Sequence, residues 1–343
     1  MRARAAAVSA ALLLAAAAPA AALSVEQPAP VELFTFTDPR IDESSGLVDL
    51  GDLLVTVNDS GDDAIVYVID RETGDTVGTT RFADSVVDVE ALAPAGRGRV
   101  WVADIGDNSA QRPDVAVYRV PVGRGDRTVT APRHTLVYPD RPQDAEALLA
   151  HPRTGRLYVV TKGLFGGTLY AAPRRLRTDG PNRLRALARA GAVVTDGAFT
   201  GDGRHVILRD YGRGTALTFP DLDRVARIAL PRQEQGEGLS VGPGNRVHVS
   251  TEGQYSAVHE VPLAPALAAE LAPQGPGDTD PGGEQTEGPA DGPLDEAGGE
   301  AVEEPADPEP PADPTVDSGW LRLGVAVLLG LLALWLVGRR TRH

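Results

Sequence analysis

Short apolar stretches of strand length, separated by turns rich in Gly, Pro and Asp, fill the chain from residue 31 to residue 263. An acidic residue followed by a short apolar run recurs five times, and each time a second apolar stretch follows that ends in polar residues. The acidic positions lie 47, 56, 50 and 41 residues apart, at Glu43, Glu90, Glu146, Asp196 and Glu237. No segment between these strands keeps a period of 3.6 residues, so the pattern favours an all-β repeat over an α/β fold.

A strand-rich unit repeated every 40–50 residues or so is typical of a β-propeller. The first four units can each be divided into four strands, whereas the fifth has only three, at 239–241, 246–251 and 257–262. Residues 31–37 alternate between apolar and polar and can supply the missing strand, which would close the ring. We therefore predict a five-bladed propeller over 31–263. Six blades are the alternative, because the long interval from Glu90 to Glu146 could contain further structure.

The repeat also predicts where polar groups gather. In a propeller blade the first strand begins at the end where the antiparallel second strand finishes. The acidic residues begin the first strands, and groups such as Asp59, Asp104 and Lys162 end the second strands, 13–16 residues after each acid. The sequence therefore predicts an inner ring of carboxylates and an outer polar ring at one end of the propeller.

Carboxylates that converge on one axis repel each other unless they are protonated or a cation neutralises them. Oxygen ligands suit Ca²⁺ better than Zn²⁺, and the chain contains no Cys. The ring therefore predicts a central cation, Ca²⁺ by hypothesis. The alternative is structural: each acid would cap a strand end and accept hydrogen bonds from backbone amides of the neighbouring blade.

Two basic residues stand out near this ring. Lys162 is the only lysine of the chain, and Arg209 ends the corresponding strand of the next unit. Together they could hold a phosphate or carboxylate, although Lys162 could equally form a surface ion pair. Asp59, Asp107 and Asn108 are further candidate ligand contacts, and Glu146 or Asp104 is a candidate general base.

The Glu-Ala-Leu strings Glu90–Leu92 and Glu146–Leu148 resemble the inner strands of the phytase-like propeller superfamily. The five-fold order is similar to that of the calcium-dependent apyrases, which are five-bladed secreted or luminal nucleotidases. This resemblance covers residues 31–263 as a pattern. It implies a central calcium at the positions that match the family's Ser, Glu, Glu, Ser and Glu, which here are Ser45, Glu90, Glu146, Asp196 and Glu237. Asp196 departs from the family pattern by replacing a hydroxyl with a charge.

The two ends of the sequence predict a membrane-anchored extracellular protein. Residues 1–22 have the charged start, apolar stretch and small-residue site of a signal peptide. Residues 320–338 fit a single transmembrane helix, and the basic residues 339–343 favour a cytoplasmic C-terminus. Between them, residues 268–318 hold 15 Asp and Glu with no Lys or Arg, which predicts a disordered stalk rich in Pro and Gly.

The net charge of −15 resides in that stalk, so the rest of the chain is neutral and a nucleic-acid partner has no electrostatic support. Two functions are compatible with these patterns. One is a ligand-binding or scaffold module that uses the cation. The alternative is a calcium-dependent phosphohydrolase acting on phosphoesters or nucleotides, in which Lys162 and Arg209 would hold the anion. In either case the cell membrane is an expected partner, through the C-terminal helix, and a small anionic or phosphorylated ligand is a further one.

Overall fold

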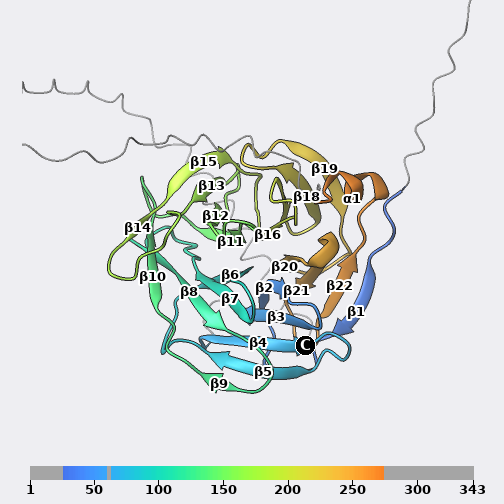
Figure 1. Ribbon diagram of the computed structural model, residues 1–343, viewed down its shortest axis with the longest axis horizontal. Helices are drawn as coiled ribbons and strands as arrows, with labels where there is room; N and C mark the ends of the chain where they lie inside the picture. The colour runs from blue at the N-terminus through green and yellow to red at the C-terminus, as the bar shows by residue number, and fades with distance from the viewer. Residues whose placement is uncertain (1–25, 60–62, 274–343) are drawn as a thin grey trace, which may run out of the picture. The chain divides into compact units, whose positions relative to one another are not determined.

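Five sheets surround one axis like the blades of a propeller in the computed structural model, which describes residues 26–59 and 63–273 (Figure 1). We number the blades in chain order of their innermost strands. Blade 1 consists of β2 (Ser44–Asp49), β3 (Leu53–Asn58), β4 (Ile65–Asp70), β5 (Thr76–Arg81) and β9 (Arg127–Thr128). Blade 2 consists of β6 (Val89–Pro94), β7 (Arg99–Asp104), β8 (Val115–Pro121), β10 (Arg133–Val137) and β14 (Asn182–Arg183).

The other three blades have four strands each. Blade 3 consists of β11 (Ala145–Ala150), β12 (Leu157–Thr161), β13 (Thr168–Ala171) and β15 (Arg185–Arg189). Blade 4 consists of β16 (Asp196–Phe199), β17 (His205–Arg209), β18 (Arg213–Thr218) and β19 (Arg224–Ala229). Blade 5 consists of β20 (Gly236–Val241), β21 (Val247–Thr251), β22 (Ala257–Val261) and β1 (Val31–Thr35).

The hydrophobic core lies between neighbouring blades, so both faces of an inner strand are covered. All six residues of β2 are buried, whereas five of the six residues of the outermost strand β19 are exposed or half-buried. Branched and small apolar side chains fill these layers, as the alternation of the sequence requires. The five innermost strands contact one another in order around the axis, with β20 against β2.

The N-terminal strand closes the ring, as predicted. β1 pairs antiparallel with β22, and Val31 lies opposite Glu260 while Thr35 lies opposite Ala257. The same pairing covers the outer edge of blade 5. The prediction of five blades is therefore confirmed, and the interval from Glu90 to Glu146 contributes β9, which pairs with β5, in place of a sixth blade.

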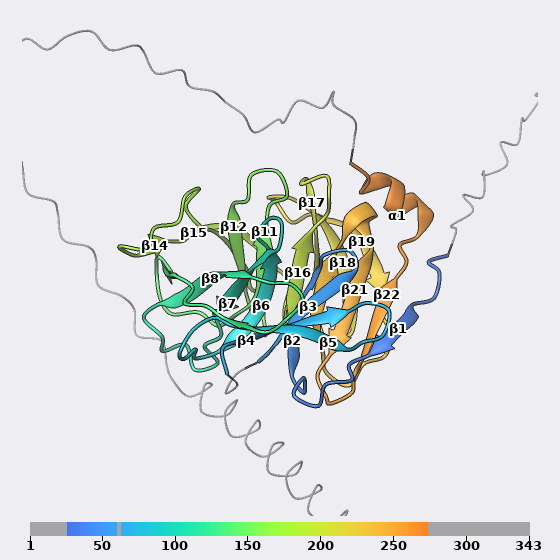
Figure 2. The same cartoon turned by 60° about the horizontal axis from the view of Figure 1, so that its bottom comes forward.

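After the last blade the chain forms the short helix α1 (Pro265–Glu270), visible beyond β22 in Figure 2. Leu271 is fully buried, and its carbonyl accepts a hydrogen bond of 2.6 Å from Asn245. The packed body thus includes residues 268–273, which the sequence assigned to the stalk. The predicted signal peptide, the rest of the stalk, the predicted transmembrane helix and the basic tail lie outside the described residues. Across 26–59 and 63–273, no helix is long and apolar enough to cross a membrane.

Candidate metal centre

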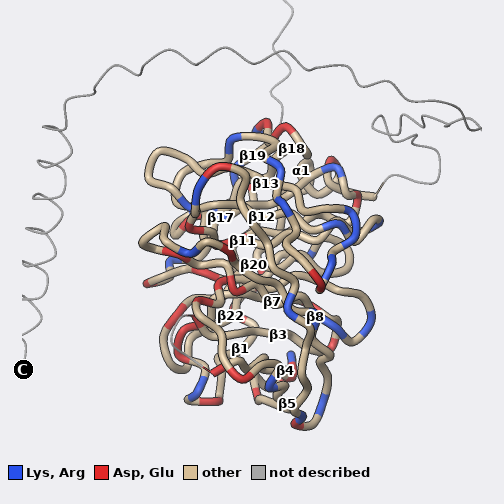
Figure 3. The backbone as a smooth tube through the Cα atoms, turned by 90° about the vertical axis from the view of Figure 1, so that its left-hand side faces the viewer, with Lys and Arg blue, Asp and Glu red and all other residues tan. Residues whose placement is uncertain are grey.

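The predicted acidic positions and the polar strand ends lie at the same end of the propeller. Val89 at the start of β6 pairs with Asp104 at the end of β7, and Asp196 pairs with Arg209 in the same way. Figure 3 shows red acidic stretches beside β11, β20 and β22. This antiparallel register therefore gathers side chains from all five blades, as the spacing of the repeat indicated.

A β-bulge begins the innermost strand in four of the five blades. The register shifts around Ser45 in β2, Glu90 in β6, Glu146 in β11 and Glu237 in β20. A bulge inserts an unpaired residue and re-aims its side chain. The register of β16 has no such shift, so Asp196 stays in direct pairing with Arg209.

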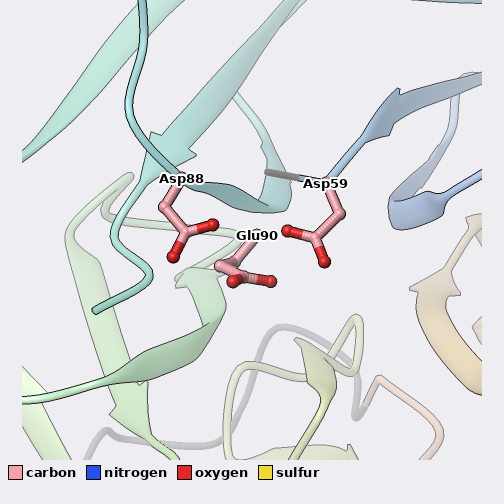
Figure 4. A group of neighbouring side chains, drawn as sticks. All are labelled: Asp59, Asp88 and Glu90. Atoms are coloured by element: carbon pink, nitrogen blue, oxygen red, sulfur yellow. The ribbon is translucent and has the colours of Figure 1, made fainter. Parts of the chain in front are cut away.

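Three carboxylates from two blades form the tightest acidic group (Figure 4). Asp59 follows β3 of blade 1, while Asp88 precedes β6 of blade 2 and Glu90 lies within β6. One oxygen from each residue lies within 4.8 Å of the others. Asp88 and Glu90 are buried, and Asp59 is half-buried.

Burial and the repulsion of other carboxylates raise the pKa values of Asp88 and Glu90. Burial first, and then the carboxylates of Asp59 and Asp144, raise the pKa of Asp88 to about 6, although Arg112 lowers it. Burial also raises the pKa of Glu90 strongly, with Glu146 as the next contribution. Oδ1 of Asp88 is buried and has no hydrogen-bond partner among the residues described. The group thus offers three converging oxygen ligands, one of which lacks a hydrogen-bond partner in the described chain, and a cation bound there would stabilise their ionised form.

The dimensions also fit a calcium ion. Each Ca–O distance is about 2.3–2.6 Å, so two oxygens on opposite sides of one ion lie up to roughly 4.6–5.2 Å apart. Gly106 packs directly against the cluster, because a Cβ at this position would collide with the carboxylates of Asp88 and Glu90. Ser45 donates a hydrogen bond of 2.8 Å to the backbone carbonyl of Glu90 and so ties blade 1 to the strand that carries the cluster.

Glu146 is neutralised by the protein itself. Its Oε1 accepts a hydrogen bond of 2.6 Å from Nζ of Lys162, which also lies 5.5 Å from the ring centre of Tyr211. Burial raises the pKa of Glu146 more than Lys162 lowers it, and the pKa of Lys162 is raised by the same pairing. The single lysine of the chain is therefore an ion-pair partner in a half-buried site.

Glu237 has no comparable cation partner. It is 4% exposed, and its Oε2 has no hydrogen-bond partner within the described part of the chain. Burial raises its pKa to about 8, with Glu146 as the next cause, while Lys162 and Arg209 lower it. Burial likewise raises the pKa of the neighbouring Glu252.

Asp196 has a structural role, which is the alternative to cation binding that the sequence left open: it accepts hydrogen bonds from backbone amides. It is fully buried and accepts hydrogen bonds from the backbone amides of Gly197 at 2.7 Å and Leu239 at 2.6 Å. The second bond crosses from blade 4 to blade 5. Burial raises its pKa well above the usual range, and the two amides oppose that rise.

Arg209 is also part of the fold. The guanidinium is buried and donates to the carbonyls of Gly238 at 2.9 Å and Ser250 at 3.1 Å, and to the side chain of Gln233 at 3.0 Å. These donors hold blade 4 against blade 5. The geometry therefore does not support the prediction that Lys162 and Arg209 together hold a phosphate or carboxylate, because Lys162 pairs with Glu146 and Arg209 donates to backbone carbonyls.

The remaining candidates lie at the end of β7 and in its connection to β8. Asp104 is 2.7 Å from Arg112 and accepts the amide of Asp88, so its carboxylate positions the start of β6. Asp107 accepts the amides of Gln111 and Arg112 and shapes the loop. Asn108 is exposed. Asp104, like Glu146, is thus committed to an ion pair, and it also positions the start of β6.

Asp88 is the site residue that the sequence reasoning missed. A signal for it was present, because Asp88-Val89-Glu90 and Asp144-Ala145-Glu146 repeat the same Asp-x-Glu pattern one blade apart. The two aspartates nevertheless differ in the fold. Asp144 accepts a hydrogen bond of 2.9 Å from the amide of Asp107, whereas Asp88 keeps one oxygen without a partner in the described chain.

No family model matches this chain, and no curated protein matches it. Among solved structures it is similar to a luciferin-regenerating enzyme, with 10% identity, a TM-score of 0.40, and coverage of 68% of this chain and 95% of the other. The gluconolactonase XC5397 from Xanthomonas campestris shows 16% identity, a TM-score of 0.40, and coverage of 64% and 72%. A glucose dehydrogenase shows 12% identity, a TM-score of 0.44, and coverage of 68% and 99%. Such distant similarity contributes nothing to the assignment of function, which rests on the site.

Proposed function

We propose that this propeller binds a divalent cation, Ca²⁺ by its all-oxygen chemistry, through Asp59, Asp88 and Glu90, and that it acts as a cation-dependent ligand-binding module. The observation that carries the proposal is the unpartnered, buried Oδ1 of Asp88 among three carboxylates within 4.8 Å. Burial and the repulsion of other carboxylates raise the pKa values of Asp88 and Glu90, and a dication offsets that repulsion. Because two blades contribute ligands, the ion also fastens blade 1 to blade 2.

The cation itself would supply the positive charge that recognises a ligand. Asp59 is half-buried, so the described residues do not fully enclose the proposed site. Three basic side chains at this end are engaged within the fold: Lys162 pairs with Glu146, Arg112 pairs with Asp104, and Arg209 donates to carbonyl groups. An anionic group of the ligand would then complete the coordination of the ion, as oxygen ligands do at open calcium sites.

Calorimetric titration of the purified chain with Ca²⁺ tests this proposal. We expect one saturable site, and at least a tenfold loss of affinity in Glu90→Gln and in Asp88→Asn. Asp84→Asn is the matched control, because Asp84 is an exposed acid in the connection that leads to β6. Unaltered calcium affinity in both cluster variants, or no calcium binding by the wild-type chain, would contradict the proposal.

A calcium-dependent phosphohydrolase is the second candidate, and Glu146 is the observation that favours it. Its buried carboxylate has a raised pKa and lies close enough to the cluster to raise the pKa of Glu90. A carboxylate tuned in this way can serve as a general base, while the ion polarises a phosphoryl oxygen. Phosphate release from nucleotides, phytate and a simple phosphoester, with Ca²⁺ and with chelator, distinguishes the two. Calcium-dependent release that is lost in Glu146→Gln supports the enzyme, and no release despite bound calcium supports the binding module.

We further propose that the propeller is displayed outside the cell on a C-terminal anchor. Support comes from the sequence of residues 1–22, 268–318 and 320–338 alone. Protease treatment of intact cells tests it. We expect the propeller to be digested and an epitope on residues 339–343 to survive, whereas protection of the propeller would refute the topology.

A further inference from the structure

A cavity of about 540 Å³ lies on the axis at the end of the propeller opposite the carboxylates. All five innermost strands line it with their C-terminal halves, for example through Leu47, Leu92, Leu148 and Leu239. The carboxylates begin those same strands, so cavity and cluster occupy opposite ends of one ring. This cavity is thus separate from the candidate metal centre.

The walls are chiefly apolar. Besides the leucines, they include the half-buried Trp101 and Ala198 and the buried Phe199, whose ring lies 5.0 Å from that of His151. The volume lies within the range of about 300–1,000 Å³ that is usual for small-molecule pockets. It is more than three times that of an engineered apolar cavity of about 150 Å³ that holds benzene. A ligand with two or three rings, or an aliphatic body of similar size, would fill it.

One positive charge at the cavity has no counter-ion. Arg119 of β8 is exposed and lines the cavity, and its Nη2 donates to the carbonyl of Ala95 at 2.7 Å. Among the ion pairs within 26–59 and 63–273, none includes Arg119. β8 lies among blue basic stretches in Figure 3. The Ala95 carbonyl thus holds an uncompensated guanidinium beside an apolar cavity.

Two polar side chains of the lining, those of Asp49 and Ser240, differ in whether the protein supplies them with a partner. Asp49 is buried and its charge is compensated, because its carboxylate lies 3.2 Å from Arg71 and 3.4 Å from Arg246. Ser240 is 3% exposed, and its Oγ has no hydrogen-bond partner in the part of the chain that is described. A polar atom buried without a partner costs free energy, and a ligand that supplies one offsets that cost.

We propose that this axial cavity is a second ligand site, for an amphipathic monoanion. The apolar part of the ligand, which has the size of two or three rings, lies between the inner strands, and the acidic group of the ligand pairs with Arg119. Guanidinium groups bind carboxylates and related anions with paired hydrogen bonds, so Arg119 sets the charge of the ligand while the leucines and aromatic rings set its size.

Two fluorescent probes of nearly the same shape test both parts of the proposal. Anilinonaphthalene sulfonate is anionic and phenylnaphthylamine is its neutral counterpart. The full chain carrying Trp320→Phe and Trp335→Phe retains Trp101 as its only tryptophan. Energy transfer from Trp101 therefore reports a probe bound near this residue, and the loss of transfer in the cavity-filling variants assigns the probe to this cavity. We expect saturable transfer with the sulfonate at one site per chain.

Substitutions at Arg119 and in the cavity wall test separately the charge of the ligand and the volume that it occupies. We expect Arg119→Gln to weaken the sulfonate at least tenfold and to leave the neutral probe unchanged. Ala198→Leu fills the cavity and should weaken both probes, and Ala150→Leu is a second filling variant in case the first unfolds. Arg224→Gln, at an exposed position of outer strand β19, is the matched control for lost charge and should alter neither affinity.

Three results would overturn the proposal. The first is the absence of saturable transfer from Trp101, and the second is unchanged binding of both probes in folded cavity-filling variants. The third is equal sulfonate affinity in the parent and in Arg119→Gln, which would refute the anionic ligand. The melting temperature of each variant shows whether it is folded.

Discussion

Replacing Glu237 by Gln should remove a pH dependence of stability that the burial of this carboxylate creates. Glu237 is 4% exposed, and burial raises its pKa from 4.5 to about 8. A raised pKa means that the folded state favours the protonated acid. The contribution of Glu237 to stability is therefore fully present below pH 4.5 and is lost as the pH rises through about 8.

The size of this effect on the free energy of unfolding follows from the difference between the two pKa values of Glu237. A difference of roughly 3.5 pKa units at about 1.36 kcal/mol each gives a ceiling of about 5 kcal/mol. Access of water and relaxation of the side chain reduce this value, so we expect about 2 kcal/mol between pH 5 and pH 8. Urea denaturation in chelator measures it, because bound calcium would mask the repulsion.

Under these conditions the wild-type chain should lose stability from pH 5 to pH 8, whereas Glu237→Gln should show a flatter profile and be the more stable protein at pH 8. The control is Glu234→Gln, since Glu234 is exposed at the same end of the propeller. Parallel pH profiles for the wild-type chain and Glu237→Gln would refute the assignment of the pH dependence to the burial of this carboxylate.

Three further predictions concern the cluster, a blade junction and the closure of the ring. Gly106→Ala places a Cβ against Asp88 and Glu90, so calcium affinity measured by calorimetry should fall at least tenfold; an unchanged affinity would mean that the ion binds elsewhere. Arg209→Met removes the charged hydrogen bonds to Gly238 and Ser250, which should cost about 3–5 kcal/mol in urea denaturation and leave calcium affinity within twofold. Deletion of residues 26–36 removes β1 and exposes the edge of β22, so the melting temperature should fall and light scattering should detect self-association; a monomer of unchanged stability would argue against closure by this strand.

The blades could be predicted from the sequence because each is a local unit. Four strands joined by short turns leave a repeat of alternating apolar residues, and the missing fourth strand of the last unit indicated a partner at 31–37. The strands β9 and β14 could not be anticipated, since two residues carry no periodicity and their pairing partners lie in other segments. The packing of Leu271 was missed for a similar reason, because α1 is too short to show a helical pattern.

The site was predictable only in part. The repeat indicated that Glu90 begins an inner strand, yet whether its side chain joins the acidic group depends on a bulge that residue types do not reveal. Asp196 illustrates the point, because its strand has no bulge and its carboxylate binds backbone amides. The pairing of Lys162 with Glu146 depends likewise on the distance between two strand ends, which spacing along the chain gives only approximately.

The five acidic residues occupy equivalent positions in the repeat, but they have different partners in the structure. This difference favours one place for the proposed cation. Lys162 compensates Glu146, and two backbone amides bind Asp196. Glu237 lacks such a partner, but the tight three-carboxylate group lies at the junction of blades 1 and 2, around the unpartnered oxygen of Asp88. A cation gains most where several oxygens converge, since a carboxylate that already pairs with a cation or an amide of the protein offers it less attraction. The pairing of Glu146 and Asp196 with protein groups is therefore the reason that we propose the blade 1–2 junction, around Asp88, as the place of the cation.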